Sequence, residues 1–156
     1  MPTHDYAITI AWTGNTGTGT SNIRSYSRNH DITAAGLPPI EASSDPAFRG
    51  DPTRWNPEQL YVAAIAQCHM LWYLGLAANA GVVVTAYEDD PTGVMIEEAS
   101  GAGQFESVTL NPRVTIAPGN DAALAESLHG RVADYCFIAR SVNTPIGHNV
   151  TIEHSA

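Results

Sequence analysis

Two cysteines, Cys68 and Cys136, are the residues of this 156-residue chain that are best suited to covalent chemistry. Two thiols are too few for a disulfide scaffold or for a zinc site built mainly on thiolates. They are therefore either inert core residues or a redox pair. In a redox pair, one thiolate attacks a peroxide oxygen and becomes a sulfenic acid. The second thiol then condenses with it to a disulfide, which an external dithiol reduces.

Such a cycle needs a positive group beside the attacking sulfur, because the thiolate is the nucleophile. Since the chain has seven arginines and no lysine, that group is an arginine or a protonated histidine, and Glu58 could orient an arginine through a bidentate contact. A carboxylate in the first turn of a helix more commonly only satisfies the helix dipole. Glu58 precedes Cys68 by ten residues, so one straight helix would separate them by ~15 Å. We therefore expect a two-fold homodimer whose antiparallel helices bring Glu58 of one subunit near Cys68 of the other.

Metal binding is the competing use of cysteine and histidine. His69 directly follows Cys68, so on a helix the two side chains point ~100° apart. His129 and Cys136 are seven residues apart, a rise of ~10 Å that is too long for one ion. We therefore expect neither a metal nor an organic cofactor, and we expect His69 to pack in the core.

The element that must position Cys68 is a long helix with a clear start. Asn56 is a good N-cap, Pro57 suits the first helical position, and the helix is predicted to run to about Asn79, with Gly81 as its C-cap. It is apolar on nearly all sides, which is typical of a helix enclosed by protein. A membrane-spanning helix is not expected, because the run contains polar residues and has no basic flank on its C-terminal side.

The other predicted elements are mostly strands joined by turns. Period-two patterns and turn residues predict strands over Tyr6–Thr13, Ile23–Thr33, Val82–Glu88, Val94–Ala99, Phe105–Ala117 and His148–His154. A second helix is predicted to start at Pro118–Asp121 and to run to about Arg140. Between the second strand and the first helix, Gly36–Asn56 is a long loop without predicted structure, and it is a candidate wall of a site. This order indicates a single α+β domain over residues 1–156, with mainly antiparallel sheet.

Charge and composition exclude several function classes. Sixteen acidic residues against seven basic ones give a formal net charge of −9. Such a chain would repel nucleic-acid phosphate and anionic membrane surfaces, so neither is expected as a partner. The N-terminus has no basic stretch followed by an apolar run, so it does not read as a signal peptide, and a cytoplasmic location is expected.

Several motifs together resemble the family of osmotically inducible protein C (OsmC) and organic hydroperoxide resistance (Ohr) proteins. The run from Asn56 to Leu60, Asn-Pro-Glu-Gln-Leu, is followed by Cys68 ten residues after the glutamate, and Cys136 lies late in the chain. The opening strand ends in Trp-Thr-Gly, and Phe-Arg-Gly-Asp precedes the helix. The residues after Cys68 suggest a divergent OsmC-like subgroup.

The resemblance implies an intertwined α+β homodimer in which sheets wrap the long central helices. It further implies a peroxidase that reduces organic hydroperoxides, with hydrogen peroxide as a second candidate substrate, and that is recycled by dihydrolipoamide-type dithiols. By resemblance, Cys68 is the peroxidatic thiol, Cys136 is the resolving thiol and Glu58 orients an arginine. That arginine is Arg49 or Arg54, and Arg28 is a more distant candidate.

Two other functions stay open from the sequence. The chain could be a non-enzymatic binding or stress protein of the same fold whose thiols are only structural. It could also be a thiol-dependent transferase or hydrolase that uses Cys68 with His69.

Overall fold

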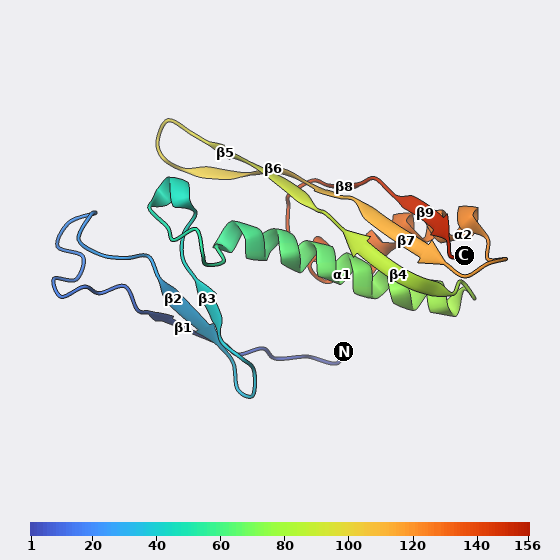
Figure 1. Ribbon diagram of the computed structural model, residues 1–156, viewed down its shortest axis with the longest axis horizontal. Coiled ribbons are helices and arrows are strands. Elements are labelled where there is room, and N and C mark those ends of the chain that lie inside the picture. The colour runs from blue at the N-terminus through green and yellow to red at the C-terminus, as the bar shows by residue number, and fades with distance from the viewer. The chain divides into compact units, whose positions relative to one another are not determined.

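The computed structural model describes all residues, 1–156, as two compact units, residues 1–60 and residues 61–156. Strands predominate in both, and one long helix begins at the end of the first unit and continues through the second (Figure 1). The predicted α+β class is confirmed, with antiparallel and mixed sheets. The expectation of a single domain stays a prediction, and each unit is described by itself below.

The first unit contains a small antiparallel sheet. Its strands β1 (Thr9–Trp12), β2 (His30–Thr33) and β3 (Ile40–Ala42) pair in that order, and a short 3-10 helix, η1 (Pro46–Phe48), follows. The first two strands are shorter than predicted: β1 begins three residues later, at Thr9, and β2 begins only at His30, because residues 17–25 form turns. In those turns Asn15 Oδ1 accepts hydrogen bonds from two backbone N–H groups, and the Ser25 hydroxyl bonds to backbone carbonyls. The loop predicted over residues 36–56 was wrong in part, since it contains β3 and η1.

The long helix α1 (Pro57–Asn79) has the predicted bounds. Asn56 Oδ1 accepts a hydrogen bond from the Gln59 N–H at 2.8 Å, and Gln59 Oε1 accepts one from the Asn56 N–H at 3.1 Å. This reciprocal pair satisfies two N–H groups that a helix start leaves free. At the other end Gly81 has φ 76°, the left-handed conformation that glycine adopts at low cost beyond a helix.

Only one stripe of α1 is buried within the chain. Its buried residues are Ile65, Ala66, His69, Tyr73 and Ala77. Enclosure of the helix on nearly all sides stays a prediction that needs a second subunit, because Leu71 is 61% exposed in the single chain. By length and composition alone α1 could cross a bilayer, a test that core helices of soluble proteins also pass.

Two three-stranded sheets form most of the second unit. One has the order β4 (Val84–Asp89), β7 (Pro112–Ile116), β9 (Thr151–His154), and the other has the order β5 (Thr92–Glu97), β6 (Gly103–Leu110), β8 (Ile146–His148). The pairs β4–β7 and β5–β6 are antiparallel, whereas β8 pairs in parallel with β6 and β9 pairs in parallel with β7.

The single strand predicted over residues 105–117 was wrong, because it divides at Asn111. The Asn111 N–H donates to Asp89 Oδ1 at 2.7 Å and its side-chain amide donates to the Asp90 carbonyl at 2.8 Å. The next residue, Pro112, has no N–H to continue the ladder. The closing strand predicted over residues 148–154 divides similarly into β8 and β9.

The second helix is much shorter than predicted. α2 (Ala122–Ser127) begins at the Asp121 cap and gives way to two 3-10 segments, η2 (Leu128–Asp134) and η3 (Ala139–Ser141). The Ser127 hydroxyl donates to the Leu124 carbonyl at 2.7 Å, and Gly130 follows, a residue that weakens helices. Cys136 therefore lies between the two 3-10 segments and not on a helix, contrary to the prediction.

The core of the second unit joins α1 to this irregular segment and to the sheets. One cluster of buried residues surrounds Tyr73, whose hydroxyl donates to the Ala125 carbonyl at 3.1 Å. A second cluster joins Ile65 and Ala66 to Val108 and Leu110 of β6. Both clusters pack against the face of α1 that carries His69.

Candidate functional site

The two sulfur atoms meet in the second unit. Cys68 lies on the half-buried side of α1, and Cys136 follows η2, where its N–H donates to the Val132 carbonyl at 2.9 Å. Their Sγ atoms lie 2.6 Å apart, with the Cys136 thiol donating toward the Cys68 sulfur. Both cysteines are free thiols. The structure thus brings together two residues that are 68 positions apart in the sequence.

The two thiols have different surroundings. Cys136 is 1% exposed, and its sulfur also accepts a hydrogen bond from the Ala139 N–H at 3.3 Å. Burial raises the pKa of Cys136, and the hydrogen bond with Cys68 raises it further. Cys68 is only half-buried. Cys136 is therefore held as a neutral thiol that donates to the more accessible sulfur.

The three arginine candidates all lie in the first unit, and two of them have partners there. Arg54 pairs with Asp31 at 3.3 Å and Glu41 at 3.6 Å. Arg28 donates to the Tyr26 and Ile23 carbonyls, and its guanidinium lies 4.1 Å from the centre of the Tyr26 ring.

Arg49 differs from both. It is exposed, has a left-handed backbone with φ 67° after η1, and makes no side-chain hydrogen bond or ion pair. Its guanidinium is thus free to bind another group.

Glu58 lies in the first turn of α1, as predicted. Its Oε2 atom is buried and has no hydrogen-bond partner. Ten residues of continuous helix separate Glu58 from Cys68, which corresponds to ~15 Å along the axis. Glu58 therefore cannot reach the Cys68 sulfur of its own chain.

Three histidines that the sequence did not bring together lie close to the thiols. His69 Nε2 and His129 Nδ1 are 2.9 Å apart, and the His148 ring centre lies 5.8 Å and 6.2 Å from the other two. His69 is buried, as predicted, but it is hydrogen-bonded and not only packed. No local motif links residues that come from α1, η2 and β8, so only tertiary structure could identify this cluster.

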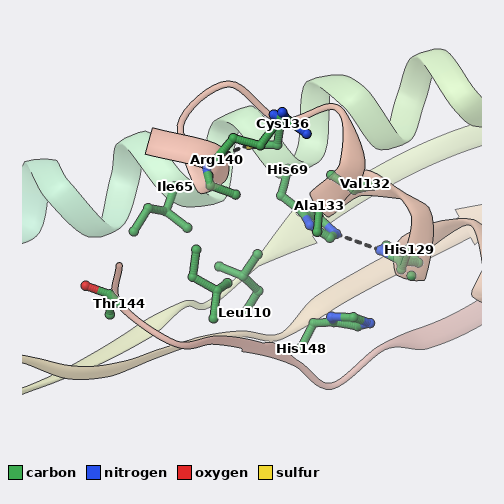
Figure 2. Close-up of a pocket in the computed structure, with 13 residues that line it drawn as sticks. Ile65, His69, Leu110, His129, Val132, Ala133, Cys136, Arg140, Thr144 and His148 are labelled. Carbon is green, nitrogen blue, oxygen red and sulfur yellow. Dashed lines mark hydrogen bonds between the residues drawn. The ribbon is translucent and has the colours of Figure 1, made fainter. Parts of the chain in front are cut away.

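The histidines line a cavity of about 320 Å³ together with Cys136 (Figure 2). Burial lowers the pKa of His69 to about 4 and that of His129 to about 3, and nearby histidine charge lowers both further. Both imidazoles are therefore neutral at pH 7. Arg140, which the sequence reasoning also missed, lines the same cavity and donates to the Asp134 carbonyl at 3.2 Å.

Comparisons with known proteins agree with this architecture. An OsmC-like protein of unknown function from Vibrio cholerae O1 biovar eltor is 27% identical, with a TM-score of 0.84, over 95% of this chain and 99% of that one. An OsmC-like protein from Mycoplasma pneumoniae is 15% identical, with a TM-score of 0.73, over 97% and 99%. The organic hydroperoxide resistance protein OhrB of Bacillus subtilis is 19% identical, with a TM-score of 0.61, over 96% and 98%.

The comparison with curated proteins gives no match. The family model described as OsmC-like protein matches residues 50–151, which include both cysteines and all of α1. This chain therefore belongs to the OsmC-like protein family.

Proposed function

We propose that this protein is a thiol-dependent peroxidase that reduces organic hydroperoxides. The observation that carries this proposal is the direct contact between the Cys68 and Cys136 sulfur atoms, 2.6 Å apart. Family membership supports it, as does the fold shared with proteins that are named for organic hydroperoxide resistance.

The proposed cycle has three balanced steps. The Cys68 thiolate attacks the outer oxygen of ROOH, the O–O bond breaks, and the leaving alkoxide takes a proton to give ROH and a Cys68 sulfenic acid. The Cys136 thiol then attacks that sulfur, which forms the disulfide and releases water. An external dithiol reduces the disulfide by exchange and is itself oxidised to a disulfide.

The surroundings of the thiols support this division of roles. Cys68 is the more accessible sulfur and accepts the hydrogen bond, an arrangement that stabilises negative charge on it. Cys136 is buried with a raised pKa, so it stays protonated until the sulfenic acid forms. Little movement is then needed for the second step, because the sulfurs already touch.

Activation of Cys68 is assigned to Arg49, held by Glu58 of a second subunit. Arg54 and Arg28 already bind groups of the first unit, whereas the Arg49 guanidinium is free. The buried Glu58 Oε2 lacks a donor, which a guanidinium would supply. Since Glu58 is ~15 Å from the Cys68 of its own helix, this assignment requires a homodimer.

The homodimer, the reductant and the location are further parts of the proposal. The face of α1 that carries Leu71 is open in the single chain, and a second subunit would cover it. The reductant is a dithiol of the dihydrolipoamide type, and the reaction takes place in the cytoplasm, where such dithiols keep thiols reduced.

The hydrolase alternative has less support. A Cys68 hydrolase would need His69 as its base, within hydrogen-bond reach of the sulfur. The His69 Nε2 atom instead bonds to His129 Nδ1, and the pKa of His69 is lowered to about 4.

Thiol titration tests the peroxidase directly. After one equivalent of cumene hydroperoxide per chain, we expect two free thiols to be lost from the reduced protein. Cys68→Ser should abolish the reaction, and Cys136→Ser should leave a sulfenic acid that dimedone traps on Cys68. If the wild-type protein keeps both thiols, the peroxidase proposal is wrong, and the non-enzymatic binding or stress protein and the Cys68 hydrolase are the functions left.

A second titration tests the arginine. Arg49→Ala should slow thiol loss at least about tenfold, as expected for the loss of a thiolate-stabilising cation. Arg24→Ala is the matched control, because Arg24 is exposed and makes no side-chain contact to a partner. Equal rates for the two variants would remove Arg49 from the mechanism without affecting the thiol assignment.

A further inference from the structure

Three aromatic side chains gather beside the thiol pair, and we call them the aromatic cluster. Trp72 stacks on Tyr135 with the ring centres 5.4 Å apart, and it meets Phe137 edge to face at 5.6 Å. Tyr135 is 40% exposed and Phe137 is 67% exposed, so ring surface stays open in the single chain. Exposed apolar side chains that gather in one place, and are not scattered singly, are typical of a binding site.

The aromatic cluster lies one helical turn from the more accessible sulfur. Cys68 and Trp72 are four residues apart on α1, so they share one face of the helix with their Cβ atoms roughly 5–6 Å apart. Opposite them, Tyr135 and Phe137 flank Cys136 in the sequence, and the Cys136 sulfur touches that of Cys68. The sulfur contact and the ring contacts therefore join the same two segments of the chain, side by side. A molecule that reaches the half-buried Cys68 sulfur has these rings next to it.

Backbone hydrogen bonds hold the segment that carries two of the rings. The N–H groups of Tyr135 and Cys136 both donate to the Val132 carbonyl, at 3.0 Å and 2.9 Å. The Ser141 hydroxyl donates to the Phe137 carbonyl at 2.6 Å. A binding surface that is ordered before its ligand arrives loses less entropy on binding. The rings are therefore placed in the reduced protein so that a planar ligand can contact them with little rearrangement.

We propose that the aromatic cluster binds the organic group of the hydroperoxide and selects substrates in which that group is an aryl ring. This inference rests on the proposed peroxidase and names its substrate class. Aromatic rings gain from stacking and edge-to-face contacts beyond the area that they bury, a gain that a saturated ring of the same size lacks. In an aryl-alkyl hydroperoxide a single carbon joins the ring to the peroxide group, a reach comparable to one helical turn. The ring can therefore rest on the cluster while the outer oxygen meets the Cys68 sulfur.

A second subunit is the competing occupant of these rings. The proposed homodimer covers the face of α1 that carries Leu71, which points ~100° away from Trp72 around the helix. The rings instead lie on the side of Cys68, and that side must stay open for any hydroperoxide to reach the sulfur. The cluster is therefore assigned to the substrate.

A matched pair of hydroperoxides tests the proposal. Cumene hydroperoxide and 2-cyclohexyl-2-propyl hydroperoxide differ in whether the ring is aromatic and are otherwise alike in size and branching. We expect the reduced wild-type protein to lose its thiols at least about threefold faster with the aryl compound, at concentrations that limit the rate. Hydrogen peroxide has no organic group, so its rate reports the chemistry of the thiols without the cluster.

Phe137→Leu tests the cluster itself. It removes the most exposed ring of the cluster and keeps an apolar side chain, so the ratio of the aryl rate to the cyclohexyl rate should fall at least about threefold. The rate with hydrogen peroxide should stay within about twofold of the wild type, because the thiols are unchanged. Tyr6→Leu is the matched control at an aromatic residue that is 90% exposed and lies outside the cluster, and it should keep the wild-type ratio.

A binding measurement on Cys68→Ser does not depend on the peroxidase. The unreactive alcohols 2-phenyl-2-propanol and 2-cyclohexyl-2-propanol carry the same organic groups as the two hydroperoxides. In titrations followed by NMR, we expect the phenyl compound to bind at least about threefold more tightly.

Several results would overturn the proposal. Equal wild-type rates with the two hydroperoxides, or an unchanged ratio in Phe137→Leu, would mean that the rings do not select the substrate and that a second subunit covers them. Equal slowing of cumene hydroperoxide and hydrogen peroxide in Phe137→Leu would make the role of the ring structural. If none of the three peroxides oxidises the thiols, the peroxidase itself is wrong. The alcohol titration then decides the aryl site alone, and equal affinity for the two alcohols would remove that site.

Discussion

Acid should destabilise this protein through two buried imidazoles. In the folded chain, burial lowers the pKa of His69 from 6.5 to about 4 and that of His129 from 6.5 to about 3. The groups that face this pair are the His148 and Tyr73 rings. Because the folded-state pKa lies below the unfolded value, the unfolded chain binds more protons below pH 6.5. The stability that the neutral imidazoles contribute is therefore complete above pH 6.5 and decreases as the pH falls toward 4.

The size of the effect follows from the two pKa values. Between pH 7 and pH 5 each unfolded imidazole becomes almost fully protonated, whereas each folded one stays almost fully neutral. Each therefore lowers the free energy of unfolding by about 2 kcal/mol over this range, and the two together lower it by about 4 kcal/mol. His129→Asn removes one titrating group, so its loss over the same range should be smaller by about 2 kcal/mol.

Urea unfolding at pH 7, 6 and 5, at one fixed chain concentration, measures these differences. His4→Asn is the control, because it replaces an exposed histidine outside the buried pair and should leave the wild-type slope unchanged. If the wild type and His129→Asn lose the same free energy between pH 7 and pH 5, His129 is not buried as a neutral group. His129 would then also not line the cavity as a neutral imidazole.

Two further predictions concern local structure. Asn56→Ala should lower the free energy of unfolding by about 1 kcal/mol, because it removes the cap of α1; Asn56→Asp, which keeps the accepting oxygen, should restore most of it in the same urea assay. Gly50→Ala should lower the free energy of unfolding by about 2 kcal/mol or more, because a Cβ there would overlap the Ser44 carbonyl group. Gly147→Ala, where a Cβ meets nothing within 4 Å, should lower it less, and thermal unfolding measures both. If Asn56→Ala and Asn56→Asp lower the free energy of unfolding equally, the cap assignment is wrong. If Gly50→Ala and Gly147→Ala are equally destabilising, the close contact at Gly50 is not what matters.

The sequence predicted best where local chemistry decides the structure. The bounds of α1 follow from a cap, a first-turn proline and a terminal glycine, all of which act within a few residues. The sequence predicted the elements worst where contacts between residues far apart in the chain decide where a strand ends. The break at Asn111 depends on Asp89 and Asp90, about twenty residues earlier in the chain. The alternation of apolar and polar residues predicts one continuous strand across such a break, because both halves keep the same period of two.

The candidate site divides in the same way. The thiol pair could be predicted because redox chemistry requires two cysteines to meet and the chain has only two. The histidine pair could not, because neither imidazole has a neighbour in the sequence that indicates its partner 60 residues away. The prediction of a core role for His69 was right about its burial and missed the hydrogen bond.

The shortened second helix is what allows both pairs to form. Cys68 and His69 are consecutive on α1, a rise of ~1.5 Å, whereas their partners His129 and Cys136 are seven residues apart. On a regular helix those partners would be ~10 Å apart along the axis, too far to reach two consecutive residues together. The chain must therefore change direction between them, and it does so in the turn after Asp134, where the Tyr135 and Cys136 N–H groups both donate to the Val132 carbonyl. The short second helix, which the hydrophobic periodicity did not predict, is thus required by the Cys68–Cys136 and His69–His129 contacts.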